Sequence, residues 1–158
     1  MIRVATAMLA LLMAPGSAMA ASYFAIAIDK KTLTVTDIRS PRQVGSTAQT
    51  YQIVINRAAK KGRKGVASEY DIRRIDFNCQ ADKVQQFYGA SYDLGGKLAD
   101  WAPKPKPWAK VKPGSVEATL RLLGCNGVAP KSGFLIGDHR IGEILADYRA
   151  GKYDRYIH

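Results

Sequence analysis

The chain has 158 residues, two cysteines and a formal net charge of +11, from 24 Lys and Arg against 13 Asp and Glu. It is long enough for one hydrophobic core, and after residue 20 no apolar run approaches the roughly 18–20 residues that a membrane-spanning helix needs. The charge favours acidic partners, although excess lysine can also serve only to keep a small domain soluble.

Residues 1–20 have the pattern of a secretion signal. Arg3 precedes an apolar run from Val4 to Ala14, and residues 18–20 (Ala-Met-Ala) form a small-residue cleavage site. The run is too short to span a bilayer, so a retained anchor is the weaker alternative. We therefore expect an exported protein whose mature chain begins at Ala21.

The first half of the chain is patterned for β-strands. Apolar runs or period-two alternation predict strands over 23–28, 32–36, 51–55, 67–79 and 84–92, with a hairpin after the first and a loop over 40–47. The fourth strand changes phase, because Tyr70 and Ile72 share one face whereas Ile75 and Phe77 share the other. We expect a bulge near residues 73–74 to restore one inward face.

Helices are expected in the second half. Four prolines within 101–114 predict an extended loop, and Ser115 can cap the helix that follows, with Glu117 in its first turn. On that helix Cys125 is expected to share a side with Leu122. A second amphipathic helix is predicted beyond Asp138, its expected cap, with an apolar stripe formed by Ile141, Ile144, Leu145 and Tyr148.

The two cysteines, Cys79 and Cys125, allow one pairing. Cys79 ends a predicted strand with its side chain inward, and Cys125 leaves the last turn of a helix that needs a sheet to cover its apolar face. In an oxidising compartment such thiols form a disulfide, which would stabilise the fold by about 4 kcal/mol. Two free buried thiols are the alternative.

Two basic segments are candidate binding sites. The first is expected to be a protruding loop that carries the largest share of any anion binding: Arg57, Lys60, Lys61, Arg63 and Lys64. The second interleaves tryptophan with lysine, a combination that can stack on sugars or bases while it meets their charges: Trp101, Lys104, Lys106, Trp108, Lys110 and Lys112. The alternatives are a solvated loop for the first segment and a Trp108 that anchors its loop to the sheet for the second.

No catalytic constellation is visible. The two histidines, His139 and His158, lack partners at metal-ligand spacing, and no nucleophile-elbow, zinc-protease or nucleotide-binding motif occurs. We therefore expect no enzyme, metal or cofactor, although Glu69 and Asp71 leave a carboxylate-pair hydrolase open.

The stretch from Tyr23 to Cys125 resembles the surface-adhesin protein E family of Gram-negative bacteria. The resemblance rests on residues 75–79 (Ile-Asp-Phe-Asn-Cys), residues 91–93 with Gly95, Trp108 with residues 111–115 (Val-Lys-Pro-Gly-Ser), and Cys125. It implies a curved antiparallel sheet with a helix tied to its concave face by the disulfide, in a protein of the periplasm or outer cell surface. The founding member binds host extracellular proteins. This chain extends about 30 residues past Cys125, which the resemblance does not cover.

Together these observations predict an α+β fold with a mostly antiparallel sheet of about five to six strands, a helix tied to it by a disulfide, and an extra C-terminal helix. The expected parts are a signal over 1–20, the adhesin-like domain over 21–127 and an extension over 128–158. The expected function is an exported, adhesin-like binding module for acidic extracellular proteins, polysaccharide or other polyanions. A small periplasmic enzyme or inhibitor and a structural envelope protein are the alternatives.

Overall fold

The computed structural model describes residues 21–157, so the expected secretion signal lies outside the described residues. All strand pairs in it are antiparallel, and two helices accompany the sheet, which confirms the α+β fold class. The strands are β1 (Ser22–Ile28), β2 (Thr32–Asp37), β3 (Arg42–Val44), β4 (Thr47–Lys61), β5 (Ala67–Asn78), β6 (Lys83–Tyr92), β7 (Leu98–Ala102), β8 (Ala109–Lys110) and β9 (Phe134–Asp138).

The sheet runs in the order β7-β6-β5-β4-β2-β1-β9, with β3 pairing to β4 and β8 to β6. The short strands β3 and β8 lie within segments expected to be loops, and β9 comes from the C-terminal extension. The helices are α1 (Val116–Asn126) and α2 (Ile141–Arg149), with 3-10 turns η1 (Arg63–Gly65) and η2 (Asp154–Tyr156).

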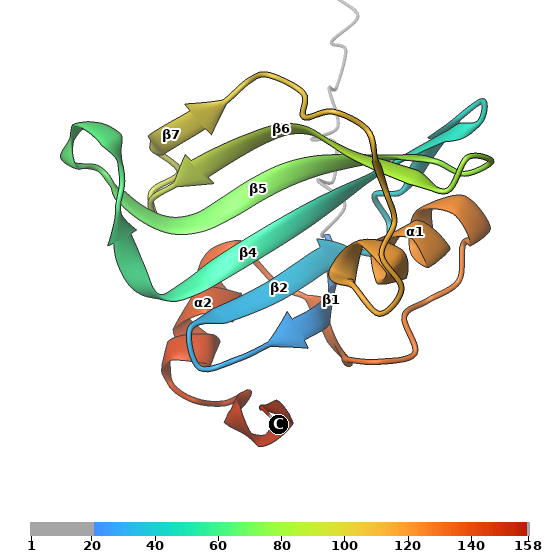
Figure 1. Ribbon diagram of the computed structural model, residues 1–158. Coiled ribbons are helices and arrows are strands. Elements are labelled where there is room, and N and C mark those ends of the chain that lie inside the picture. The colour runs from blue at the N-terminus through green and yellow to red at the C-terminus, as the bar shows by residue number, and fades with distance from the viewer. Residues whose placement is uncertain (1–20, 158) are drawn as a thin grey trace, which may run out of the picture.

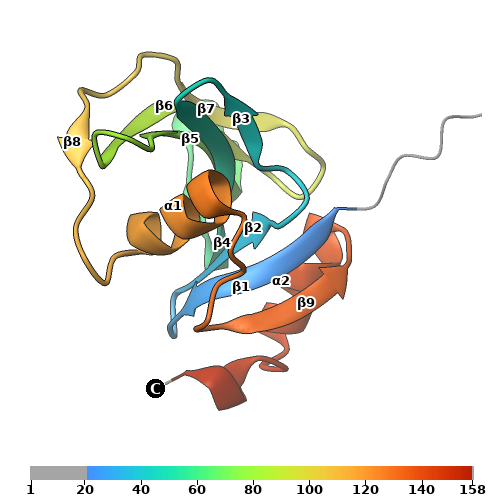
Figure 2. The ribbon, with the colours of Figure 1, turned by 90° about the vertical axis from the view of Figure 1, so that its right-hand side faces the viewer.

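The two helices cover opposite faces of the sheet (Figures 1 and 2). Along β4, Ile53 and Ile55 belong to the apolar cluster under α2, whereas Ala48 belongs to the cluster under α1. Because successive side chains of a strand point to opposite faces, one strand serves both clusters. Each face of the sheet is therefore covered in part by one helix.

This arrangement corrects the expected bulge at residues 73–74. From Thr47 to Ile55, β4 pairs with β5 residue by residue, so β5 passes through Arg73 and Arg74 without a shift relative to β4. Tyr70 and Ile72 pack in the α2-side cluster, and Ile75 and Phe77 in the α1-side cluster. At the change of phase, the apolar side chains of β5 switch from the face covered by α2 to the face covered by α1. A register shift does lie beside Arg74, between Arg74 and Ile75, but it belongs to the pairing of β5 with β6, and the extra residue, Phe87, is on β6.

Helix α1 begins and ends as the sequence predicts. The Ser115 hydroxyl accepts a hydrogen bond from the Ala118 amide at 3.2 Å, and Gly127 closes the helix with φ of 64°. The buried face of the helix carries Leu120, Leu123 and Gly124, whereas 47% of Leu122, which was expected to share a side with Cys125, is exposed. Gly124 lets the helix approach β4, since a Cβ there would lie 3.0 Å from Thr50 Cγ2.

Helix α2 buries Ile144, Leu145 and Tyr148, three residues of the predicted stripe. Its cap is Arg140 rather than Asp138, which instead ends β9. The Arg140 amide donates to Glu143 Oε2 at 2.8 Å, and the Tyr148 hydroxyl donates to the Asp29 carbonyl at 2.6 Å. The second bond fixes α2 to the β1–β2 turn.

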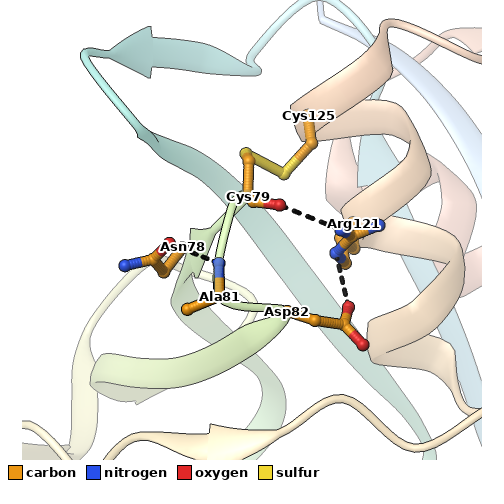
Figure 3. Close-up of a disulfide and its surroundings, with 6 residues drawn as sticks. All are labelled: Asn78, Cys79, Ala81, Asp82, Arg121 and Cys125. Atoms are coloured by element: carbon orange, nitrogen blue, oxygen red, sulfur yellow. Dashed lines mark hydrogen bonds and ion pairs between the residues drawn. A yellow bond between two sulfur atoms is a disulfide. The ribbon is translucent and has the colours of Figure 1, made fainter.

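The predicted disulfide between Cys79 and Cys125 is present, with a Cα–Cα distance of 5.7 Å. Figure 3 shows that it joins the turn after β5 to the last turn of α1. Arg121 strengthens the connection, because its guanidinium donates to the Cys79 carbonyl at 3.0 Å and lies 2.8 Å from Asp82. The same turn receives a third connection, since the Asp82 carbonyl accepts from the amide of Val111 at 3.1 Å.

Candidate anion-binding pocket

A cavity of about 400 Å³ opens on the α1 face of the sheet. Strands β4, β5 and β6 supply its floor, the segment 106–112 its outer wall, and the start of α1 one end. In Figures 1 and 2 the connection from β7 to α1 runs along the same side of the sheet as that helix. We call this cavity the basic pocket.

The register of the sheet brings the polar floor together. Gln52 on β4 lies opposite Arg73 on β5, and Arg73 lies opposite Gly89 on β6. Gln86 lies opposite Ile75, two residues further along β5. A Cβ on Gly89 would come 3.0 Å from Gln86 Nε2, so the glycine leaves the room that the Gln86 amide occupies.

Gln52 is the most deeply placed polar side chain of this floor. Only 7% of the residue is exposed, it lines the pocket, and its side-chain amide forms no hydrogen bond within residues 21–157. The Gln52 amide is not one of the buried unpaired polar groups of the described residues, so it is open to the pocket. Its donor and acceptor atoms are therefore available to a group that enters the pocket.

Three lysines form the outer wall: Lys106, Lys110 and Lys112. All three are exposed, and none forms an ion pair within the described part of the chain. Their backbone is fixed, because the Lys106 amide donates to the Gln86 carbonyl at 2.9 Å and Gln85 Nε2 donates to the Lys106 carbonyl at 2.7 Å. Val111, between the other two lysines, is buried in the α1-side cluster.

The charges around the pocket are unbalanced. Arg73 and the three wall lysines face a single lining carboxylate, that of Glu117. Arg73 is partly neutralised by Asp71, whose Oδ2 lies 3.5 Å from its Nη2. The N-terminus of α1 adds the positive end of the helix dipole, which favours anions over about one helical turn. This arrangement is suited to hold an anion, with hydrogen-bonding groups beneath it.

The first predicted segment is only in part the expected loop. Strand β4 continues to Lys61, so Arg57, Lys60 and Lys61 lie on a strand, while Arg63 and Lys64 lie in η1. The hairpin of β4 and β5 protrudes from the sheet in Figure 1. Arg57 is ion-paired with Asp154 and lies over the Tyr148 ring at 4.2 Å.

Arg63 also has an internal partner, because its Nε lies 3.0 Å from Asp100. Lys60 and Lys61 are exposed and unpaired among the described residues. Two of the five cations are therefore occupied by carboxylates of the protein itself.

The second segment is divided. Its lysines 106, 110 and 112 line the basic pocket, whereas Trp101, Lys104 and Trp108 do not. The Trp101 ring contacts that of Tyr88 with centroids 5.5 Å apart, and 46% of the residue is exposed. Trp108 remains 42% exposed, so it is not buried against the sheet as the alternative had it.

Three floor residues were not singled out by sequence reasoning: Gln52, Arg73 and Gln86. They come from three strands, and only the register of the sheet brings them together. The one local signal is Gln52, a polar residue at the start of the apolar run Ile53–Ile55, on the face opposite Ile53.

Other site types find little support among the described residues. No group of three or more His, Cys, Asp and Glu there could hold a metal ion. His139 is exposed at the end of β9, and His158 lies outside the described residues. Within the described part of the chain, no helix is both long and apolar enough to cross a membrane.

Comparisons of the chain with family models, curated proteins and solved structures found no match.

Proposed function

We propose that this protein is a binding module for anionic partners and that the basic pocket is its binding site. The observation that carries the proposal is the unpartnered amide of the buried Gln52, which lies beneath a wall of three lysines without ion partners. A rim that attracts anions and a floor amide that is available for hydrogen bonds together favour a polar, anionic ligand. Net charge alone would explain the lysines but not the available amide beneath them.

Geometry also favours the basic pocket over the segment 57–64. Arg57 and Arg63 already bind Asp154 and Asp100, so an anion at that segment would have to compete with internal carboxylates. The wall lysines form no ion pair within the described residues, although the carboxylate of Glu117 lines the same pocket. The pocket is also concave, which concentrates the field of its charges on a bound group.

The proposal includes an exported, adhesin-like role. A disulfide suits an oxidising compartment, and the signal pattern of residues 1–20 suits export to the periplasm or outer surface. In that setting the partners would be acidic extracellular proteins, polysaccharides or other polyanions.

The test compares two variants that remove equal charge. One changes Lys106, Lys110 and Lys112 to Gln, and the other changes Lys60, Lys61 and Lys64 to Gln. Retention on a heparin column should fall much further in the first variant, and the salt dependence of binding should become shallower. Both proteins should keep their circular dichroism, since none of the six lysines belongs to either apolar cluster.

Equal loss of retention in the two variants would mean that net charge alone attracts heparin. A larger loss in the second variant would return the site to the segment 57–64. Either result would refute the basic pocket as the binding site.

A further inference from the structure

We infer that the occupant of the basic pocket is an acidic sugar, whose hydroxyl groups bond to the floor while its anionic group meets the wall. This inference rests on the proposed function and adds the chemical class of the ligand. It is carried by the carboxamide of Gln52, which forms no hydrogen bond within the described protein and is open to the pocket, beside aliphatic side chains and near the wall lysines.

The floor distinguishes a sugar from a simple anion. A carboxamide offers both a donor and an acceptor, so the Gln52 side chain needs a ligand group that donates as well as accepts. Phosphate, sulfate and carboxylate groups in their ionised forms only accept, which would leave the Gln52 carbonyl oxygen unpaired. A hydroxyl satisfies both halves of the amide, and Gln86 offers a second carboxamide two residues further along the floor.

The remaining lining fits the carbon face of a sugar ring. Ile75, Val84 and Pro107 present aliphatic surface inside the same cavity. Its volume of about 400 Å³ lies in the range of roughly 300–1,000 Å³ that small-molecule pockets occupy. No aromatic side chain lines the pocket, so the stacked platform with which proteins hold unpaired bases is missing there.

The wall supplies the recognition of charge. Lys106, Lys110 and Lys112 all line the pocket from the segment that forms its wall. An anionic substituent on the ring would meet them at the rim while the hydroxyls reach the floor. An acidic peptide could satisfy the wall equally well, so the test must separate the two classes.

The experiment measures binding calorimetrically with two probes that carry three carboxylates each. One is trigalacturonate and the other is triglutamate with both ends blocked; a heparin tetrasaccharide serves as a sulfated sugar. The variant Gln52→Met keeps the length of the side chain and removes its amide. We expect it to weaken both sugars about tenfold, the loss of one to two neutral hydrogen bonds, and to leave triglutamate unchanged.

The thermal midpoint provides the control. Since the side chain of Gln52 forms no hydrogen bond within the described protein, Gln52→Met should unfold at the same temperature as the wild type or a higher one. A residue with only a structural role would not lower sugar affinity while it preserves stability. Galacturonate monomer distinguishes the source, because binding of the monomer indicates a free sugar and binding of the trimer alone indicates a polysaccharide.

Two results would overturn the inference in different ways. If triglutamate binds as tightly as the sugars and Gln52→Met changes none of them, the pocket binds anions in general; the proposed function then stands without the sugar. If the variant with Gln at Lys106, Lys110 and Lys112 binds all probes as the wild type does, the proposed function fails as well.

Discussion

Arg57 illustrates how a charge in a basic segment can be used within the fold. Its guanidinium binds Asp154, a hydrogen bond that lowers the pKa of that carboxyl below its ordinary value. It also lies over the Tyr148 ring, and Arg149 donates to its carbonyl at 2.6 Å. Asp154 thus favours folding above its ordinary pKa, and this contribution is lost as the pH falls through the lowered value.

Tyr88 gives a prediction at the same scale. Burial, and then a hydrogen bond with Tyr51, raise the pKa of Tyr88 to about 12. In an alkaline titration followed by tyrosinate absorbance, Tyr88→Phe should remove a component that titrates near pH 12. Because the raised pKa belongs to the folded state, the stability due to Tyr88 is complete below about pH 10 and is lost as the pH rises towards 12.

A Tyr88→Phe protein that retained the component near pH 12 would contradict the assignment.

Among the elements, β5 shows which structural features the sequence pattern predicts and which it does not. Period-two alternation located the strand and its phase change, and the helix signals located α1 with its cap. The pattern could not show whether the phase change is a bulge or a change of face. The answer depends on the position of α2, which lies far along the chain and covers the face that Ile72 serves.

The basic pocket has the same limit. Its wall lysines are close in sequence and belong to a segment that composition singles out. Its floor residues Gln52, Arg73 and Gln86 are each ordinary strand residues, and they form a site only through the pairing of β4, β5 and β6. Strand register depends on the tertiary fold, so the sequence predicted the wall lysines, which are close in the chain, but not the floor residues.

The disulfide gives the prediction for an element. Changing both Cys79 and Cys125 to Ser should lower the free energy of unfolding by about 2–5 kcal/mol, because the crosslink limits the unfolded chain. Denaturant unfolding at equilibrium measures the loss. Reductant should destabilise the wild type by a similar amount and leave the double variant unaffected; an equal effect on both would contradict the prediction.

The same element bears on the pocket. The turn after β5 holds α1 through the disulfide and holds the wall segment through the Asp82–Val111 bond. The wall segment and the last turn of α1 are thus both fastened to this turn.

At the scale of the whole molecule, the signal pattern gives a prediction of processing. N-terminal sequencing of the protein from an envelope fraction should read Ala21-Ser22-Tyr23, because the small residues 18–20 follow an apolar segment of signal length. Intact protein beginning at Met1 in that fraction would identify residues 1–20 as a retained anchor. The control is a protein with Ala18 and Ala20 changed to bulky residues, which should remain unprocessed.

The placement of β1 has a consequence for the order in which the molecule can assemble. Strand β1 lies between β2 and β9, so one of the first described strands is flanked by one of the last. Tyr23 and Tyr148 likewise share one apolar cluster. During synthesis, Leu33 and Val35 stay uncovered until α2 has been made, because α2 supplies the residues that pack on them. Until then the emerging chain exposes an apolar surface and an unpaired strand edge, which chaperones can bind.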